Sequence, residues 1–217
     1  HCPNSSLKLI IRSFALAFSS SRLAPPMQQS NSCSSIASSK VNSTLTDFPL
    51  LVSLSTSITG FSYNALLDPD SDGIRTGGDL RFYASNGKEL AYEIADWNTS
   101  GTSNIWVKVP TISSSVNTVI TAAWGKTGTE TTPDYATNDP VWSNGYEGVW
   151  HLGKISSGTT NDSSPNGIHL TANGGPSIST GQIGRGFTLD GSDDDLEAVG
   201  YKGITGGAER SMQLWIK

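Results

Sequence analysis

The sequence predicts an all-β fold, with two antiparallel β-sandwich-type modules in a row. Short apolar runs recur at intervals of roughly ten residues from residue 41 onward, turn residues separate them, and no helical period lies between them. Hydrophobic residues make up 35% of the chain and charged residues 15%, and Ser, Thr, Gly and Asn fill the difference. Such hydroxyl-rich solvent faces favour a secreted or cell-surface protein.

The first module is predicted over residues 41–125. Its strands are short apolar runs, and in 80–83 and 89–94 apolar and polar residues alternate, as expected when one face of a strand lies in a core. Asn86 and Gly87 favour a hairpin turn between two runs, because both residues tolerate a positive φ angle. A later run is expected to end at Pro110, which has no N–H for a ladder. The predicted strands are 49–54, 80–83, 89–94, 105–109 and 116–124.

Residues 126–140 are predicted to be a linker, because they are rich in Thr, Gly and Asp and show no apolar period. The second module is predicted to fill residues 141–217. A strand is expected at 146–152, and the chain stops inside a further apolar run at 212–216 that has the pattern of a strand. We therefore interpret the sequence as a fragment of a longer multidomain chain.

Residues 1–40 lack the strand pattern, and Ser30 to Ser39 contain a single large aliphatic residue, Ile36. A basic start, a short apolar region and a Ser-rich tract resemble a degraded secretory signal. The alternative is non-native upstream sequence. We expect no ordered structure from this segment under either interpretation.

The charge balance excludes some partners. The net charge of −5 and the pI near 5.1 argue against nucleic acid, because binding a polyphosphate needs clustered Lys and Arg. No run of 18 or more apolar residues exists, so no transmembrane helix is predicted.

An acidic loop is the sharpest local motif. Asp68, Asp70 and Asp72 alternate along it, Gly73 follows, and Asp79 stands at the twelfth position counted from Asp68. Carboxylates at this spacing can converge their oxygens on Ca²⁺. The alternative is a solvated acidic turn, because a longer Glu usually closes such loops and no helices flank this one. Calcium is thus the one cofactor that the sequence suggests.

Aromatic residues provide a second hint of function. Flat rings can stack on sugars, and four of them fall at predicted strand ends or on polar faces: Trp97, Trp106, Trp142 and Tyr146. The alternative is core packing, which is where most Trp residues of sandwiches lie.

Catalytic motifs are not found in residues 41–217. His151 has no readable nucleophile or orienting partner, so it is interpreted as a structural residue. These residues also lack the pattern of paired carboxylates that glycoside hydrolysis needs. A second acidic run consists of Asp193, Asp194 and Asp195, with Asp190 nearby. On a strand, consecutive carboxylates would point to opposite faces and could not all reach one metal ion, so we interpret the run as a solvated turn. We therefore expect no enzyme activity in this region.

Four motifs in order resemble a bacterial module known as domain of unknown function 2341, over about residues 40–125. They are Thr46-Asp47-Phe48-Pro49, Gly78-Asp79-Leu80-Arg81-Phe82, Leu90-Ala91-Tyr92-Glu93-Ile94-Ala95-Asp96-Trp97 and Ile105-Trp106-Val107-Lys108-Val109-Pro110.

The second module resembles the start of a concanavalin A-like jelly roll of the laminin-G-like type, truncated after its opening third. The residues that carry this resemblance are 148–152, the loop at Asp162, 184–191 and 214–217. Such jelly rolls often hold calcium near loops, so the resemblance implies Asp162 as a metal ligand.

Together these resemblances imply a non-catalytic extracellular or cell-surface protein of bacterial type that binds glycans of polysaccharides or glycoproteins, or serves adhesion. Two alternatives stay open. One is an accessory region of a larger polysaccharide-degrading enzyme, and the other is a structural spacer of a surface protein.

Overall fold

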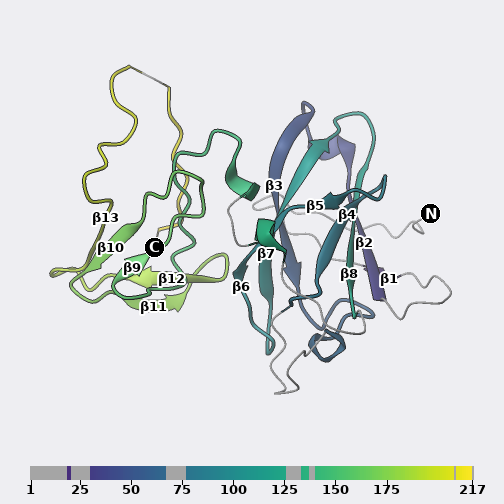
Figure 1. Ribbon diagram of the computed structural model, residues 1–217, viewed down its shortest axis with the longest axis horizontal. Helices are drawn as coiled ribbons and strands as arrows, with labels where there is room; N and C mark the ends of the chain where they lie inside the picture. The colour runs from purple at the N-terminus through teal and green to yellow at the C-terminus, as the bar shows by residue number, and fades with distance from the viewer. Residues whose placement is uncertain are drawn as a thin grey trace. The chain divides into compact units, whose positions relative to one another are not determined.

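The computed structural model describes residues 19–20, 30–66, 77–125, 133–136, 140–207 and 209–216 (Figure 1). The chain is all-β, as predicted, and its strands pair antiparallel. It divides into two compact units, His1–Asn144 and Gly145–Lys217. In the described part, no helix is long and apolar enough to cross a membrane.

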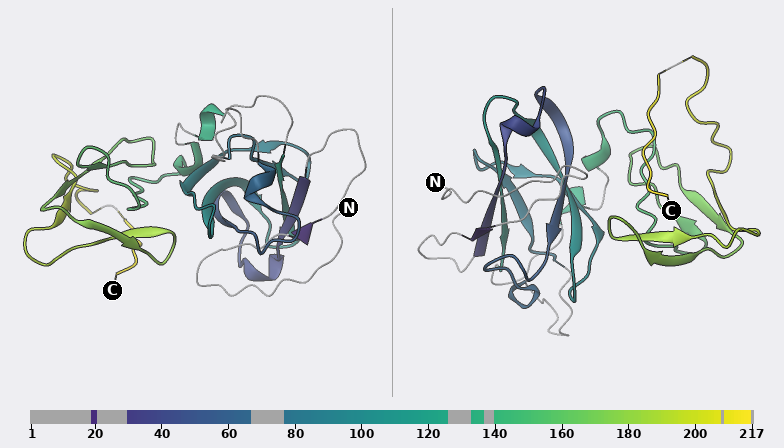
Figure 2. Two further views of the ribbon diagram at one scale, coloured as in Figure 1. Left: turned by 90° about the horizontal axis from the view of Figure 1, so that it is seen from below. Right: turned by 180° about the vertical axis from the view of Figure 1, so that it is seen from behind.

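The first unit contains two antiparallel sheets, which Figures 1 and 2 show from three directions. Their strand orders are β1-β2-β8-β4-β5 and β3-β7-β6. Three one-turn 3-10 helices, η1 (Ser38–Lys40), η2 (Tyr63–Ala65) and η3 (Asp134–Ala136), lie between or after the strands, and η4 (Pro140–Trp142) follows them. The strands are β1 (Ser19–Ser20), β2 (Ser30–Ile36), β3 (Leu45–Leu54), β4 (Arg81–Ala84), β5 (Glu89–Leu90), β6 (Tyr92–Asp96), β7 (Ser103–Ile112) and β8 (Thr118–Trp124).

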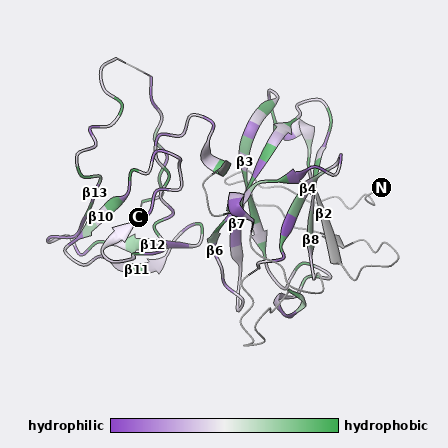
Figure 3. Ribbon diagram, viewed as in Figure 1, coloured by the Kyte–Doolittle hydropathy of each residue, from purple (hydrophilic) through white to green (hydrophobic). Residues whose placement is uncertain are grey.

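An apolar core lies between these two sheets. Alternate residues of each strand face it, and Figure 3 shows the resulting apolar and polar bands along the strands. Burying a large apolar side chain stabilises a fold by about 1.5–3 kcal/mol, so a core of this size is the main source of stability for the first unit. Its members include, from one sheet, Leu50, Val52, Tyr92, Ile105, Val107 and Val109, and from the other Ile36, Phe82, Leu90, Ile120, Ala122 and Trp124.

Two predicted strands differ from the observed ones. The run at 89–94 forms two strands, because the chain passes from one sheet to the other at Ala91 while Leu90 and Tyr92 both stay in the core. The strand expected to end at Pro110 continues to Ile112. Pro110 is tolerated because no ladder pair forms between it and the facing residue Asp47.

The Ser-rich segment before the first module contributes a strand. β2 pairs with β8 at seven consecutive positions, from Ser30 opposite Trp124 to Ile36 opposite Thr118. Sequence patterns do not detect this strand, because backbone groups make the ladder and Ile36 is its one aliphatic residue. Of the predicted disordered segment 1–40, residues 19–20 and 30–40 are described, and they belong to the first unit.

The second unit is built from short strands. β10 lies between β13 and β9 in one sheet, and β11 and β12 form a separate hairpin. Gly174 follows β10 with a φ angle of +76°, and a Cβ atom there would lie 2.4 Å from the carbonyl oxygen of Asp193, so only glycine fits. The strands are β9 (Thr159–Thr160), β10 (Leu170–Asn173), β11 (Ser177–Thr180), β12 (Arg185–Thr188) and β13 (Asp195–Glu197).

Two strand predictions for the second unit are wrong. Residues 146–152 form no strand, because Leu152 has a φ angle of +53° and the backbone of Val149 is bound to Asp162 and Ser163 instead of a neighbouring strand. Residues 212–216 are also irregular, and four of them have exposed apolar side chains. An alternating pattern yields a strand only when another strand lies beside it to accept its hydrogen bonds.

The interior of the second unit is polar. Among its described residues, one large apolar side chain is buried, that of Leu170, whereas Thr160, Asp162, Ser163 and Ser164 are all buried. Seven of its large apolar residues are exposed: Ile178, Leu189, Val199, Met212, Leu214, Trp215 and Ile216. Hydrogen-bonded polar groups therefore form part of the interior of this unit.

Candidate functional site

The outer face of the β3-β7-β6 sheet gathers aromatic and charged side chains. Along β7, Ile105, Val107 and Val109 enter the core, so Trp106 and Lys108 lie on the opposite face. Glu93 of β6 pairs with Trp106 across the ladder. The segment that begins with η4 covers this face. We call the resulting surface the tryptophan face: Glu93, Trp106, Lys108, Trp142, Ser143 and Asn144.

Each contact in the tryptophan face fixes a side chain. The rings of Trp106 and Trp142 meet edge to face, with centroids 5.0 Å apart and planes at 63°. The indole N–H of Trp142 donates to Glu93 Oε2, and Lys108 Nζ donates to Ser143 Oγ at 2.5 Å. Asn144 Nδ2 donates to the carbonyl oxygen of Thr46 at 3.1 Å. The partly buried Trp106 thus has two charged neighbours on this face, Lys108 and Glu93, and a hydrogen bond holds each of them.

A second aromatic contact comes from η3, near the point where the chain passes from β5 in one sheet to β6 in the other. Tyr135 packs edge to face on Tyr92 at 5.9 Å and donates its hydroxyl hydrogen to Glu89. Glu89 also lies 3.4 Å from Arg81 Nε. Burial, and then the hydrogen bond to Glu89, raise the pKa of Tyr135. Residues 133–136 and 140–144, most of which were predicted to be linker, therefore pack on the first unit, and the boundary between the units follows Asn144.

Because of Tyr92, the stability of the first unit is expected to fall at alkaline pH. Burial raises the pKa of Tyr92 from 10.0 to about 12. Between these values the folded state keeps a proton that the unfolded state loses, so stability is fully present below about pH 10 and falls as pH rises toward 12. We expect Tyr92→Phe to lose less stability over this window, measured as urea midpoints across the pH range. An equal alkaline loss in both proteins would contradict the assignment.

The four aromatic residues predicted to bind ligand have different surroundings. Trp142 is 5% exposed, so its ring serves packing, whereas Trp106 is partly exposed although its indole nitrogen is buried. Trp97 packs edge to face on Tyr63 at 5.5 Å and over Gly77, where a Cβ atom would lie 2.7 Å from the indole. Tyr146 lies in the second unit, and its burial raises its pKa. The structure brings two of the four together, Trp106 and Trp142.

Most of the predicted calcium loop lies outside the described residues, namely Asp68, Asp70 and Asp72. The fourth proposed ligand, Asp79, is 1% exposed, and its Oδ2 accepts a hydrogen bond from the backbone N–H of Gly125 at 2.6 Å. This contact joins the start of β4 to the end of β8. Calcium binding by the loop stays a prediction.

Asp162, the other predicted metal ligand, is the centre of a hydrogen-bond network. Its Oδ1 accepts from the backbone N–H groups of Val149 and Ser164, both at 2.8 Å. Its Oδ2 accepts from Ser164 Oγ at 2.7 Å and from the backbone N–H of Ile168 at 2.9 Å. A carboxylate offers about four acceptor positions, and protein donors fill four here. The network explains the burial of this charge through hydrogen bonding within the chain.

A third acidic group was not recognised as a cluster in the sequence. Single oxygens of Asp190, Asp193 and Asp194 lie within 4.8 Å of one another. The sequence predicted a solvated turn over Asp193, Asp194 and Asp195. Asp193 lies in a bend, as expected for a turn, whereas β13 begins at Asp195. Backbone N–H groups occupy part of the cluster, since Asp190 N donates to Asp194 Oδ2 and Ser192 N donates to Asp190 Oδ1, both at 2.8 Å.

The sequence did not single out Glu93, Lys108 or Ser143 as site residues. Their strand alternation places Glu93 and Lys108 opposite the core, which was a usable signal. Their proximity to Trp106 and Trp142 was not readable, because it depends on the ladder register and on the fold of a segment that has no strand pattern.

The fold and the tryptophan face together define a β-sandwich-like module with a preorganised aromatic and polar surface. Residues 76–139 match the family model described as Domain of unknown function (DUF2341), so this part of the expected resemblance over 40–125 is confirmed. The match runs from just before β4 through η3 and includes Glu93, Trp106 and Lys108. Nothing supports a concanavalin A-like domain after it. No curated protein and no solved structure matches the chain.

Proposed function

We propose that the chain is a non-catalytic extracellular or cell-surface module that binds neutral or charged glycans, or mediates adhesion through them, at the tryptophan face. One observation supports this most directly: the partly exposed Trp106 is held edge to face by Trp142, with Lys108 and Glu93 as its neighbours on the same face. A sugar presents a C–H face that packs on an aromatic ring and a rim of hydroxyl groups that both donate and accept hydrogen bonds.

Preorganisation strengthens this proposal. A side chain that is already fixed before binding loses little rotamer freedom, which saves about 0.5–1.5 kcal/mol for each long side chain. Ser143 fixes Lys108, and Trp142 fixes Glu93. A Lys ammonium has three N–H donors, so Lys108 can engage a sugar hydroxyl while it donates to Ser143.

The binding proposal is tested with Trp106→Ala. We expect wild-type protein to be retarded in native gels that contain a soluble polysaccharide, with galactomannan, xylan, mixed-linkage glucan and dextran as probes. The variant should bind about tenfold more weakly, since removing a central anchor of a binding surface costs about 1.4 kcal/mol or more. Trp215→Ala is the matched control, because Trp215 is 54% exposed and belongs to the second unit.

Two further observations keep this test interpretable. Lys108→Gln removes the charge, but its amide can still donate to Ser143. This variant should therefore weaken binding without loosening η4, which Trp106→Ala could do. Thermal melting of each variant separates loss of binding from loss of fold. If wild-type protein migrates unchanged in every polysaccharide gel, the proposal is wrong and the structural-spacer alternative gains support.

A further inference from the structure

The tryptophan face has a negative charge balance once its border is included. Glu93 and Lys108 contribute one charge of each sign, and Asp47 of β3 lies at the border of the face. Among the described residues of the face and this border position, two carboxylates therefore accompany one ammonium. We infer that the face selects neutral glycans over acidic ones, and that Asp47 sets this preference. The inference rests on the proposed function of the same surface.

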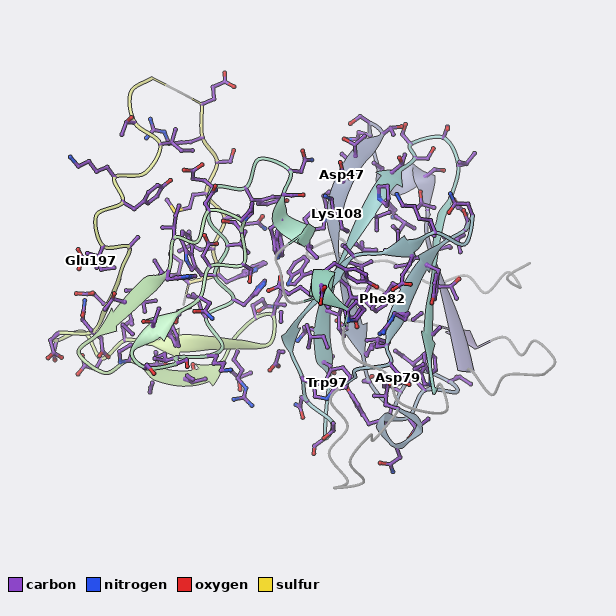
Figure 4. The ribbon with its side chains drawn as sticks, in the orientation of Figure 1. Asp47, Asp79, Phe82, Trp97, Lys108 and Glu197 are labelled. Atoms are coloured by element: carbon purple, nitrogen blue, oxygen red, sulfur yellow. The ribbon has the colours of Figure 1, made fainter. Side chains whose placement is uncertain are left out.

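The ladder register and one hydrogen bond place Asp47 beside the face. Pro49 pairs with Lys108, so Asp47 is two residues along β3 from the position opposite that lysine. Its neighbour Thr46 accepts the hydrogen bond from Asn144, and Ser143 next to Asn144 binds Lys108. Figure 4 labels Asp47 and Lys108 in the same part of the first unit. Asp47 is half-buried, so part of its charge is available to a ligand.

The backbone at Asp47 makes a clean charge variant possible. Its φ angle is +46°, in the left-handed region that few residues other than Gly, Asn and Asp adopt readily. Asn tolerates this conformation and has the shape of Asp, so Asp47→Asn removes the charge while the strand keeps its path. Ala would add backbone strain, and a change in binding could then have either cause.

Electrostatics predict the direction of selection. An acidic sugar placed over Trp106 would meet the carboxylates of Glu93 and Asp47, while Lys108 can answer one charge and is already bound to Ser143. Like charges within a Debye length, which is about 10 Å at 0.1 M salt, repel at a partly exposed surface. The chain as a whole carries a net charge of −5, which acts in the same direction.

Matched polymers test this selection on the full chain. Dextran with dextran sulfate, and methyl-esterified with de-esterified galacturonan, share a backbone and differ in charge. For any backbone that binds, we expect the neutral member to bind about fivefold more tightly at low salt, the effect of one surface charge pair. This preference should shrink at high salt. Equal or tighter binding of the charged member would overturn the inference and leave glycan binding intact.

Two variants assign the preference to named residues. Asp47→Asn should reduce the preference for the neutral polymer to about twofold or less, while neutral binding changes little. Glu93→Gln should reduce it too, because the amide oxygen still accepts from Trp142. Asp190→Asn, an exposed carboxylate of the second unit, is the matched control and should change nothing. An unchanged preference in Asp47→Asn overturns the role of Asp47. If no polymer of any pair binds wild-type protein, the proposed function and this inference both fail.

Discussion

Replacing Asp162 by alanine is expected to destabilise the second unit by about 3–5 kcal/mol, because each buried donor left without an acceptor costs about 1–3 kcal/mol. The substitution leaves the backbone N–H groups of Val149, Ser164 and Ile168 without their acceptor. The unit has little apolar interior to compensate, since Leu170 is the one large apolar side chain buried among its described residues. Few single substitutions elsewhere in this unit should cost as much.

Amide hydrogen exchange is the direct measurement for Asp162→Ala. Exchange should accelerate in the peptides that contain the three N–H groups, while the strands of the first unit keep their protection. Asp190→Ala is the matched control: its carboxylate also accepts a backbone N–H, that of Ser192, but is exposed. This control should cost about 0.5 kcal/mol or less. Unchanged protection around residues 149–168 in Asp162→Ala would show that the network is not what holds this unit together.

Replacing Phe82 by alanine is expected to destabilise the first unit by about 3–5 kcal/mol, the usual cost of deleting a buried aromatic ring. Phe82 is fully buried, pairs with Ala122 and Leu90 on its two neighbouring strands, and packs edge to face on Tyr92 of the opposite sheet at 5.3 Å. It thus joins the two sheets of the sandwich. The cavity would open at the point where both sheets contribute to the core.

The urea midpoint of the first unit measures this loss. Val116→Ala is the matched control, because Val116 is also apolar but is 64% exposed, and it should cost about 0.5 kcal/mol or less. Amide hydrogen exchange in the second unit should not change in Phe82→Ala, because Phe82 belongs to the first unit and distant sites without shared partners respond independently. A similar small effect for both variants would mean that Phe82 is not part of the core between the sheets.

The sequence by itself determined the all-β class and most strands of the first unit. Short apolar runs over 49–54, 80–83, 105–109 and 116–124, separated by turn residues, predicted strands, so β3, β4, β7 and β8 were foreseeable. Alternation of side chains along a strand placed Trp106 away from the core. The polar residues around Asp162 placed this carboxylate in a loop. Its four hydrogen-bond donors come from segments that no local pattern connects.

Only the tertiary structure decided which residues meet. β2 exists because β8 offers it a ladder, although its own residues are mostly serine. Trp142 belongs to a segment without periodicity, and its partners Glu93 and Trp106 come from strands about 36 to 49 residues earlier in the chain. The path at Ala91 and the irregular course of 146–152 depend likewise on distant groups. Periodicity reports one face of one element, whereas a binding surface needs the register between elements, and long-range hydrogen bonds and packing set that register.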